Sequence, residues 1–252
     1  MKWQQIRDRY PYLYETHLHT SQASACARRS GEEMARAAKA YGYTGIFVTD
    51  HNWGGNTRID SGLPWKQWVD AYCAGYLNAE RAGEKLGLDV FFGMEAGFSG
   101  TEFLLYGIDG EWLKEHPEIK TADVGNLYKK IKEAGGMMIH AHPFREEYYI
   151  PEIRLYPEYA DGVEGINATH SNPASTGHNH PEYDVKALAY AREHGLPLTA
   201  GSDIHSVELL GGGMAFKRRL SSVQDFIQAV TGEEDYILTD GDNYYTRYGE
   251  LI

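Results

Sequence analysis

Short apolar runs alternate with longer amphipathic segments along most of the chain. The apolar runs have the length of buried strands, and the segments between them carry apolar residues at helical spacing. Strands are predicted over residues 12–16, 45–49, 88–93, 103–108, 137–141, 162–166, 196–200 and 236–239. Helices are predicted over residues 30–41, 65–86, 124–134, 183–194 and 221–230. This alternation favours a parallel sheet covered by helices.

Local signals sharpen several of these boundaries. Ser30 and Glu33 form a capping box, and Gly42 ends the helix that follows it. About seven strand–helix units favour a closed or nearly closed α/β barrel over an open sheet. Because no linker, repeat or low-complexity tract interrupts the chain, a single domain over residues 1–252 is expected.

Histidines gather where the predicted strands end. The histidines in this position are His17, His19, His51, His140, His142, His170 and His205. In a barrel, side chains from distant positions meet at the carboxyl ends of the strands. We therefore expect these residues to form one site. The others, His116, His178, His180 and His194, are expected at the surface.

Acidic residues accompany these histidines. Asp203 precedes His205 by two residues, and Glu95 continues an otherwise apolar strand, where an unpaired buried carboxylate would be costly. Imidazole and carboxylate ligands without thiolates suit Zn, Mn or Fe. The number of candidate ligands exceeds the four of a single tetrahedral site. Two or three divalent metal ions are therefore predicted.

Composition narrows the possible partners. With 42% hydrophobic and 24% charged residues, the chain is typical of a soluble globular protein. Its apolar runs are far shorter than the roughly 18–20 residues that span a bilayer, so no membrane association is expected. The N-terminus shows no secretory signal, and Cys26 and Cys73 form no paired motif, so a cytoplasmic location is expected. A net charge of −12 disfavours long duplex nucleic acid, although bound cations would reverse the field locally.

The motifs HxH, TDH, Glu, AHP and GSDxH occur at residues 17–19, 49–51, 95, 141–143 and 201–205. In this order and spacing they resemble the PHP (polymerase and histidinol phosphatase) family. The resemblance covers the chain from His17 to His205. It implies a distorted (β/α)7 TIM-like barrel, a trinuclear metal centre and phosphoester hydrolysis.

The same resemblance implies how the ligands are shared. The ligands of the first ion would be His17, His19, Glu95 and Asp203. Glu95 would bridge to a second ion, which His142 would also bind. His51 and His205 would hold a third ion.

Two positions depart from the family pattern. Many members have a histidine before the strand over 103–108, where this chain has Glu102, a carboxylate that could still ligate. Many members also supply Asp or His shortly after HxH. In this chain either Ser24 or Cys26 takes that role or the ligand is missing. His140 is either a ligand or a residue that orients one. His170 is a ligand of the second ion, a donor to substrate or an ordinary loop histidine.

The mechanism that follows is hydrolysis by a metal-bound hydroxide, because clustered ions lower the pKa of a shared water toward about 7. Arg145 is expected to hold phosphate oxygens, since its planar fork matches phosphate geometry. The alternative is a surface arginine paired with Glu146 or Glu147. His205 or His170 could protonate the leaving oxygen if it is not tied to metal.

Two other functional classes remain open. An amidohydrolase-type metallohydrolase also begins with HxH, but it usually needs a bridging carbamylated lysine, and residues 88–93 contain none. A metal-binding domain without catalytic activity is compatible with Glu102 and with the stretch around Cys26. The expected substrate is a small phosphorylated molecule or a short nucleotide, whose ring could stack on Tyr148 or Tyr149. No motif indicates an oligomeric state.

Overall fold

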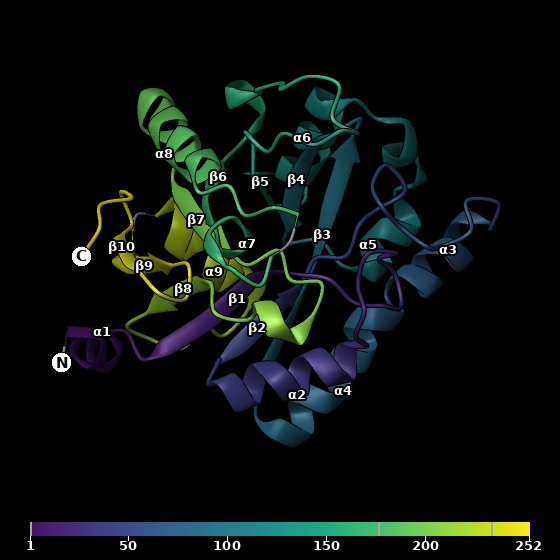
Figure 1. The fold of residues 1–252 in the computed structure, drawn as a ribbon. Helices are drawn as coiled ribbons and strands as arrows, with labels where there is room; N and C mark the ends of the chain where they lie inside the picture. Colours follow the sequence, from purple (N-terminus) through teal and green to yellow (C-terminus); the bar gives the residue numbers. More distant parts are fainter. Residues whose placement is uncertain (1, 176, 233) are drawn as a thin grey trace.

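The computed structural model describes residues 2–175, 177–232 and 234–252. Its strands are β1 (Tyr12–Leu18), β2 (Gly45–Val48), β3 (Asp89–Phe98), β4 (Thr101–Tyr106), β5 (Met137–Ala141), β6 (Gly162–Asn167), β7 (Leu198–Gly201), β8 (Gly213–Phe216), β9 (Tyr236–Thr239) and β10 (Tyr244–Thr246). They form one curled sheet in the order β10-β9-β8-β1-β2-β3-β4-β5-β6-β7 (Figure 1).

The sheet is parallel in two blocks rather than throughout. β1, β2 and β3 pair in parallel, and so do β5, β6 and β7. Between the blocks, β4 runs antiparallel to both of its neighbours. The turn at Ser99 and Gly100, which joins β3 to β4, is too short to hold a crossover helix. β8 also pairs antiparallel with β1. The α/β class is confirmed, as a curled half-barrel, whereas the regular (β/α)7 count is not confirmed.

The curl brings β1 beside the segment that follows β7. Leu18 and Ile204 form a parallel bridge. The amide of His19 donates to the Ile204 carbonyl at 3.0 Å, and the Ile204 amide donates to the His17 carbonyl at 3.2 Å. Residues nearly 190 positions apart in the chain are therefore joined at the carboxyl end of β1.

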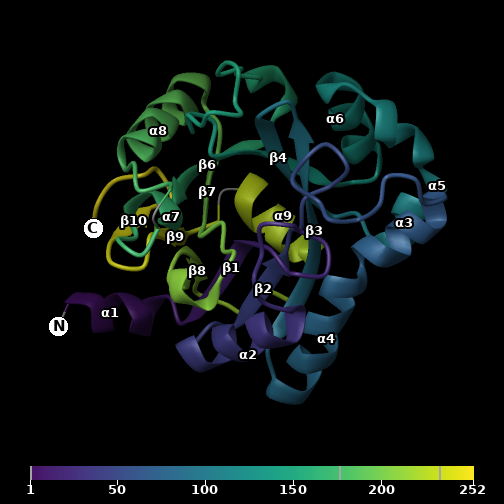
Figure 2. The ribbon, with the colours of Figure 1, turned by 45° about the vertical axis from the view of Figure 1, so that its right-hand side comes forward.

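Helices cover the outside of the curl, and one lies within it (Figures 1 and 2). The α-helices are α1 (Lys2–Arg9), α2 (Gly31–Tyr41), α3 (Trp65–Tyr72), α4 (Ala74–Leu86), α5 (Gly110–Glu115), α6 (Val124–Glu133), α7 (Ala168–Ser171), α8 (Glu182–His194) and α9 (Val223–Thr231). Short 3-10 turns are η1 (Pro117–Thr121), η2 (Pro157–Tyr159) and η3 (Val207–Leu209). None of the helices in the described part of the chain has the length and apolar character to cross a bilayer.

The predicted helix boundaries hold where capping signals are strong. The capping box of Ser30 and Glu33 starts α2, and Gly42, with φ of 109°, ends it. The helix predicted over 65–86 is instead divided at Cys73 into α3 and α4. At the start of α4, a Cβ on Gly75 would lie 1.9 Å from Thr20 Oγ1. The division therefore accompanies a close approach of α4 to the loop after β1.

The main apolar core fills the amino-terminal end of the curl. Phe226 of α9 packs against Phe47 of β2 with ring centroids 4.6 Å apart, and against Tyr106 of β4 at 5.1 Å. Figure 2 shows α9 enclosed by the strands. Because α9 and these aromatic rings occupy that end, the polar side chains at the carboxyl ends of the strands are left to build a site.

Candidate metal centre

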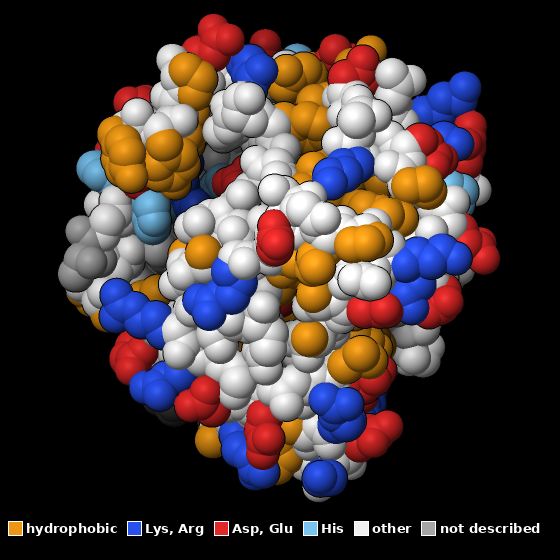
Figure 3. Space-filling view, turned by 90° about the vertical axis from the view of Figure 1, so that its right-hand side faces the viewer, with side chains coloured by type: hydrophobic (Ala, Val, Ile, Leu, Met, Phe, Trp, Pro, Cys, Tyr) orange, Lys and Arg blue, Asp and Glu red, His pale blue; other side chains and the backbone are white. Residues whose placement is uncertain are grey.

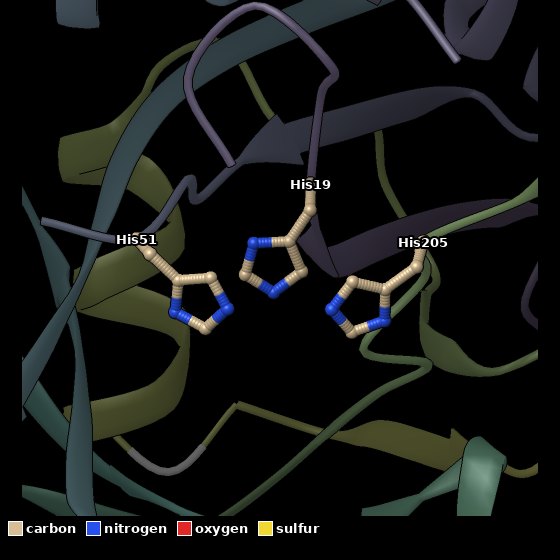
Figure 4. Close-up of side chains that lie close together, drawn as sticks. All are labelled: His19, His51 and His205. Atoms are coloured by element: carbon tan, nitrogen blue, oxygen red, sulfur yellow. The ribbon is translucent and has the colours of Figure 1, made fainter. Parts of the chain in front are cut away.

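The carboxyl ends of β1, β2, β3, β5 and β7 bring together the predicted ligands. Four overlapping groups of side chains each place their ligand atoms within 4.8 Å of one another. The groups are His17, Glu95 and His142; His17, His19 and Asp203; His51, Glu95 and Glu102; and His19, His51 and His205. Figure 4 shows the last group, with the three imidazole rings side by side. The convergence predicted from the strand ends is thus found for these residues.

Glu95 lies at the centre of the groups. Its Oε1 is 3.2 Å from His17 Nε2 and 3.1 Å from His142 Nε2, and its Oε2 is 2.6 Å from His51 Nδ1. The Glu95 side chain is completely buried. A carboxylate whose two oxygens face different imidazoles has the geometry that a ligand shared between two ions requires.

Asp203 closes the opposite side of the cluster. Its Oδ1 lies 3.0 Å from His19 Nε2 and 3.5 Å from His17 Nε2. Its Oδ2 lies 2.6 Å from a terminal nitrogen of Arg145. Asp203 therefore connects the ligand groups to a buried guanidinium.

Several polar atoms of these ligand groups are buried and lack a complete set of hydrogen bonds. Glu95 Oε2 and His51 Nδ1 are buried and in contact, yet neither has a hydrogen bond of acceptable direction within the described part of the chain. Asp203 Oδ2 is also buried, and its closest partner among the described residues is the Arg145 guanidinium. Leaving such atoms unpaired is costly, and a shared cation would satisfy them. The donor set of imidazoles and carboxylates therefore fits divalent metal ions.

Two histidines are oriented by partners behind them. His17 Nδ1 lies 2.9 Å from Glu164 Oε1, so a proton on Nδ1 leaves Nε2 free to ligate. His19 Nδ1 lies 3.2 Å from Ser24 Oγ, which itself donates to Asp50 at 2.6 Å. Ser24, one of the alternatives considered for the ligand that follows HxH, lies instead against His19 Nδ1 and Asp50.

Glu164 was missed by the sequence reasoning. It is fully buried on β6, where it also accepts hydrogen bonds from the His142 amide and from Asn167 Nδ2. The available signal was an acidic residue in the middle of the apolar run 162–166. That signal is the same as the one that identified Glu95.

The electrostatic field of the cluster favours positive charge. Burial opposes ionisation of Glu95, but His51 and His17 lower its pKa well below the usual range. Burial opposes protonation of His51, but Glu95 raises its pKa well above the usual value. Burial and the neighbouring Glu95 raise the pKa of Glu102. Carboxylates that stabilise a proton on His51 in this way would also stabilise divalent cations.

The backbone at two candidate ligands is strained. His142 has φ of 28° and Asp203 has φ of 52°, and residues other than glycine rarely adopt such positive angles. Such conformations cost free energy and occur most often at functional sites. At His142 the unusual φ turns the chain immediately after β5.

His140 and His170 lie outside the four ligand groups. The His140 ring stacks on Phe103 with centroids 4.7 Å apart, and burial lowers its pKa to about 3. His170 Nδ1 is 2.6 Å from Asp184 Oδ1, and His170 Nε2 accepts from Arg145 Nε at 3.3 Å. The structure thus brings His170 to the site through Arg145, and it places His140 against an aromatic ring.

A cavity of about 640 Å³ opens beside the ligand groups. Its inner wall includes Arg145, which is only 5% exposed, so the alternative of a surface arginine is wrong. Tyr148 and Tyr149 lie along the rim, and Tyr148 is 97% exposed. Cys26 also lines the cavity, and so does His178, which was expected at the surface and lies 2.6 Å from Glu147.

The surface beyond the site carries charges of both signs. Figure 3 shows Lys and Arg side chains interspersed with Asp and Glu over one face of the molecule. This mixture contrasts with the single basic stripe that a protein gripping long nucleic acid usually presents.

Comparisons with known proteins agree with the motifs. Among protein families, the PHP-associated family matches residues 182–233. Comparison with curated proteins finds no match. A two-domain Bacteroides vulgatus protein containing a predicted PHP-like metal-dependent phosphoesterase has a TM-score of 0.61 and 19% identity, covering 92% of this chain. This chain spans 66% of that protein, slightly less than two thirds of its length.

Two further structures have the same fold. An inferred metal-dependent phosphoesterase from Bifidobacterium adolescentis has a TM-score of 0.52 and 16% identity, covering 77% of this chain and 88% of its own. PsfC from Pseudomonas syringae has a TM-score of 0.56 and 17% identity, covering 96% of this chain and 91% of its own. The resemblance to the PHP family that the motifs indicate is confirmed.

Proposed function

We propose that this chain hydrolyses the phosphoester of a small phosphomonoester or a nucleotide, using two or three divalent metal ions. The observation that carries the proposal is the position of Arg145. Its buried guanidinium touches the candidate ligand Asp203 and lines the same cavity as His51 and His205. Buried carboxylates and imidazoles suit many metallohydrolases, whereas a guanidinium fork beside them matches the oxygens of a phosphate.

The ions would be held by the four overlapping groups. The proposed ligands are His17, His19, His51, Glu95, Glu102, His142, Asp203 and His205. Bound divalent ions supply charge stabilisation for the phosphate and lower the pKa of a shared water. Glu95 would be shared between ions, and Glu102 would take the place of the histidine that many family members have. The ligand types favour Zn, Mn or Fe.

The lining of the cavity indicates the orientation of the substrate. A volume of about 640 Å³ lies within the range typical of small-molecule sites. Arg145 and the ligand groups would bind the phosphate at the inner end. Tyr148 and Tyr149 at the rim would contact the remainder of the substrate, with a ring as the best match to an aromatic side chain.

The names of two structural neighbours support the reaction class. The Bacteroides vulgatus and Bifidobacterium adolescentis proteins are both described as metal-dependent phosphoesterases. At identities of 19% and 16%, the similarity supports a shared fold and does not identify the substrate. The reaction assigned to this chain therefore rests on its own ligand groups and on Arg145.

The proposal is tested by measuring metal content and turnover on the same sample. Protein purified without chelator is assayed by inductively coupled plasma mass spectrometry and with p-nitrophenyl phosphate, with and without EDTA. We expect two or three ions per chain and turnover that EDTA abolishes. Glu95→Gln should lose metal and reduce turnover roughly 100-fold or more, because supporting residues alone are worth 10–100-fold.

His194→Asn is the matched control, since His194 is an exposed histidine in the last turn of α8. It should keep the metal content and turnover of the wild-type protein. Less than one ion per chain after reconstitution with Mn or Zn would contradict the multinuclear centre. Full metal content without turnover of any phosphoester would favour the metal-binding domain without catalytic activity.

A further inference from the structure

Three buried side chains beside the cavity form a continuous series of contacts. Asp184, on α8, lies with its Oδ1 2.6 Å from His170 Nδ1 on α7. His170 Nε2 lies 3.3 Å from Arg145 Nε in the loop after β5. Asp184 is 8% exposed, His170 1% and Arg145 5%. Each contact is therefore shielded from water, where hydrogen bonds are stronger than in solvent.

The donor at one end of this series of contacts determines which ring nitrogen of His170 carries the proton. Arg145 Nε carries a single hydrogen and can only donate, so His170 Nε2 must accept. A neutral imidazole holds its one proton on the other nitrogen, which faces Asp184 Oδ1. Asp184 Oδ1 also accepts from the Asn167 amide at 3.2 Å, which agrees with an acceptor at this position. His170 is therefore fixed as the Nδ1–H tautomer.

Arg145 is held from a second side as well. One terminal nitrogen of its guanidinium lies 2.6 Å from Asp203 Oδ2. The other terminal nitrogen is buried and has no hydrogen-bond partner among the described residues. Two contacts therefore fix the plane of the guanidinium, and Arg145 lines the cavity with one terminal nitrogen that has no partner among the described residues.

We infer that Asp184 and His170 are positioning residues, which hold Arg145 so that its free nitrogen receives a phosphate oxygen of the substrate. The inference rests on the proposed function and deepens it. It also gives His170 a role that differs from proton donation to the leaving group or metal ligation. Both of those roles need Nε2, whose lone pair already accepts the Arg145 hydrogen.

The tautomer of His170 gives a test that needs neither metal nor activity. A long-range ¹H–¹⁵N spectrum of the full chain, with the His170 signals identified by their loss in His170→Gln, shows which ring nitrogen carries the proton. We expect protonation at Nδ1 only. A proton on Nε2 would overturn the inference, because two N–H groups would then face each other.

Binding of inorganic phosphate to the metal-loaded protein tests the effect on Arg145. By isothermal titration calorimetry, Asp184→Asn and His170→Leu should each raise the Kd of phosphate roughly 10-fold, the effect of one charge-assisted hydrogen bond. His170→Gln should lose less, because its amide oxygen can still accept from Arg145. In an Arg145→Met background, neither Asp184→Asn nor His170→Leu should weaken binding further.

This last comparison separates positioning from a general loss of structure. If Asp184→Asn or His170→Leu weakened phosphate binding equally with and without Arg145, the inference would be wrong. Glu182→Gln is the control, because Glu182 is an exposed acidic residue on α8 that pairs with His180. It should leave the Kd unchanged. Metal content of each variant is measured in parallel, so that a lost ion is not mistaken for a displaced arginine.

The failure of the proposed function would give a different result. If the wild-type protein hydrolyses no phosphoester but shows the Nδ1–H tautomer and the Arg145-dependent loss of phosphate affinity, the positioning chain stands and the reaction is wrong. If turnover is present but His170→Leu leaves phosphate affinity unchanged, the reaction stands and the positioning chain is wrong.

Discussion

At the scale of single residues, His140 and His142 show what a motif can and cannot predict. Residues two apart in a strand point to the same side, so the pattern HxH gives both imidazoles the same direction. In the structure, His142 lies after the end of β5 with φ of 28°, and its ring turns toward Glu95. His140 stays within β5 and stacks on Phe103. The motif could not separate them, because the difference arises from one backbone angle.

Substituting each of the two histidines by leucine tests this assignment. We expect His142→Leu to lose metal, because His142 Nε2 lies 3.1 Å from Glu95 Oε1 within a ligand group. We expect His140→Leu to keep its metal, since His140 Nδ1 has no hydrogen-bond partner in the described ranges and the ring contacts an apolar side chain. The free energy of unfolding of His140→Leu should change by less than about 1.5 kcal/mol.

Metal content by mass spectrometry and urea unfolding are the two measurements. Because the substitutions are identical and both sites are buried, each variant serves as the control for the other. Loss of metal from both variants would make His140 a ligand or a direct support of one.

At the scale of elements, apolar runs predicted where strands lie but not their direction. The run that became β4 is apolar like the runs of the parallel strands, and the Ser99–Gly100 turn reverses its direction relative to β3. That serine–glycine pair was a readable turn signal. Its consequence is local, because the hairpin places Glu102 opposite Gly97 and within one ligand group with Glu95.

A pair of glycines fixes the loop after β2 against this hairpin. A Cβ on Gly54 would lie 2.1 Å from the carbonyl oxygen of Gly97, and Asn52 Oδ1 accepts from both of their amides. Gly54→Ala must therefore push the loop that follows His51 away from β3. We expect it to lower the free energy of unfolding by about 1–3 kcal/mol and to weaken metal binding.

Gly62→Ala is the matched control, because a Cβ there meets only the end of the Asp60 side chain, at 3.3 Å. Unfolding and metal titration of both variants are compared with the wild-type protein. A Gly54→Ala protein with unchanged metal affinity would show that the position of this loop does not control the ligand His51.

At the scale of the whole molecule, the centre concentrates buried negative charge. Glu95, Glu164 and Asp203 are almost fully buried there, with Arg145 as their cationic neighbour. Like charges in a shielded site repel one another strongly. The fold should therefore gain stability when divalent ions enter, by an amount that grows with ion concentration.

Glu102→Gln should change the stability in opposite directions with and without metal. In EDTA we expect a higher Tm than that of the wild-type protein, because one member of a crowded carboxylate pair is neutralised. With Mn or Zn at 100 times the Kd, the wild type should gain about 2.7 kcal/mol. Glu102→Gln should gain less.

Differential scanning fluorimetry at both conditions measures these shifts. Glu193→Gln, an exposed residue on α8, is the control for the removal of one negative charge. Equal metal-induced shifts in Glu102→Gln and the wild type would mean that Glu102 contributes nothing to ion binding.

The bridge between Leu18 and Ile204 joins two segments that are synthesised at very different times. His17 and His19 leave the ribosome long before Asp203 and His205, and at about 5–20 residues per second this interval lasts on the order of ten seconds or more. Until then, the two ligand groups that contain Asp203 or His205 are incomplete, whereas the residues of the other two groups have already been made. The four groups are therefore complete together only in a nearly finished chain, and an ion held by an early group would be in place before Asp203 and His205 join the centre.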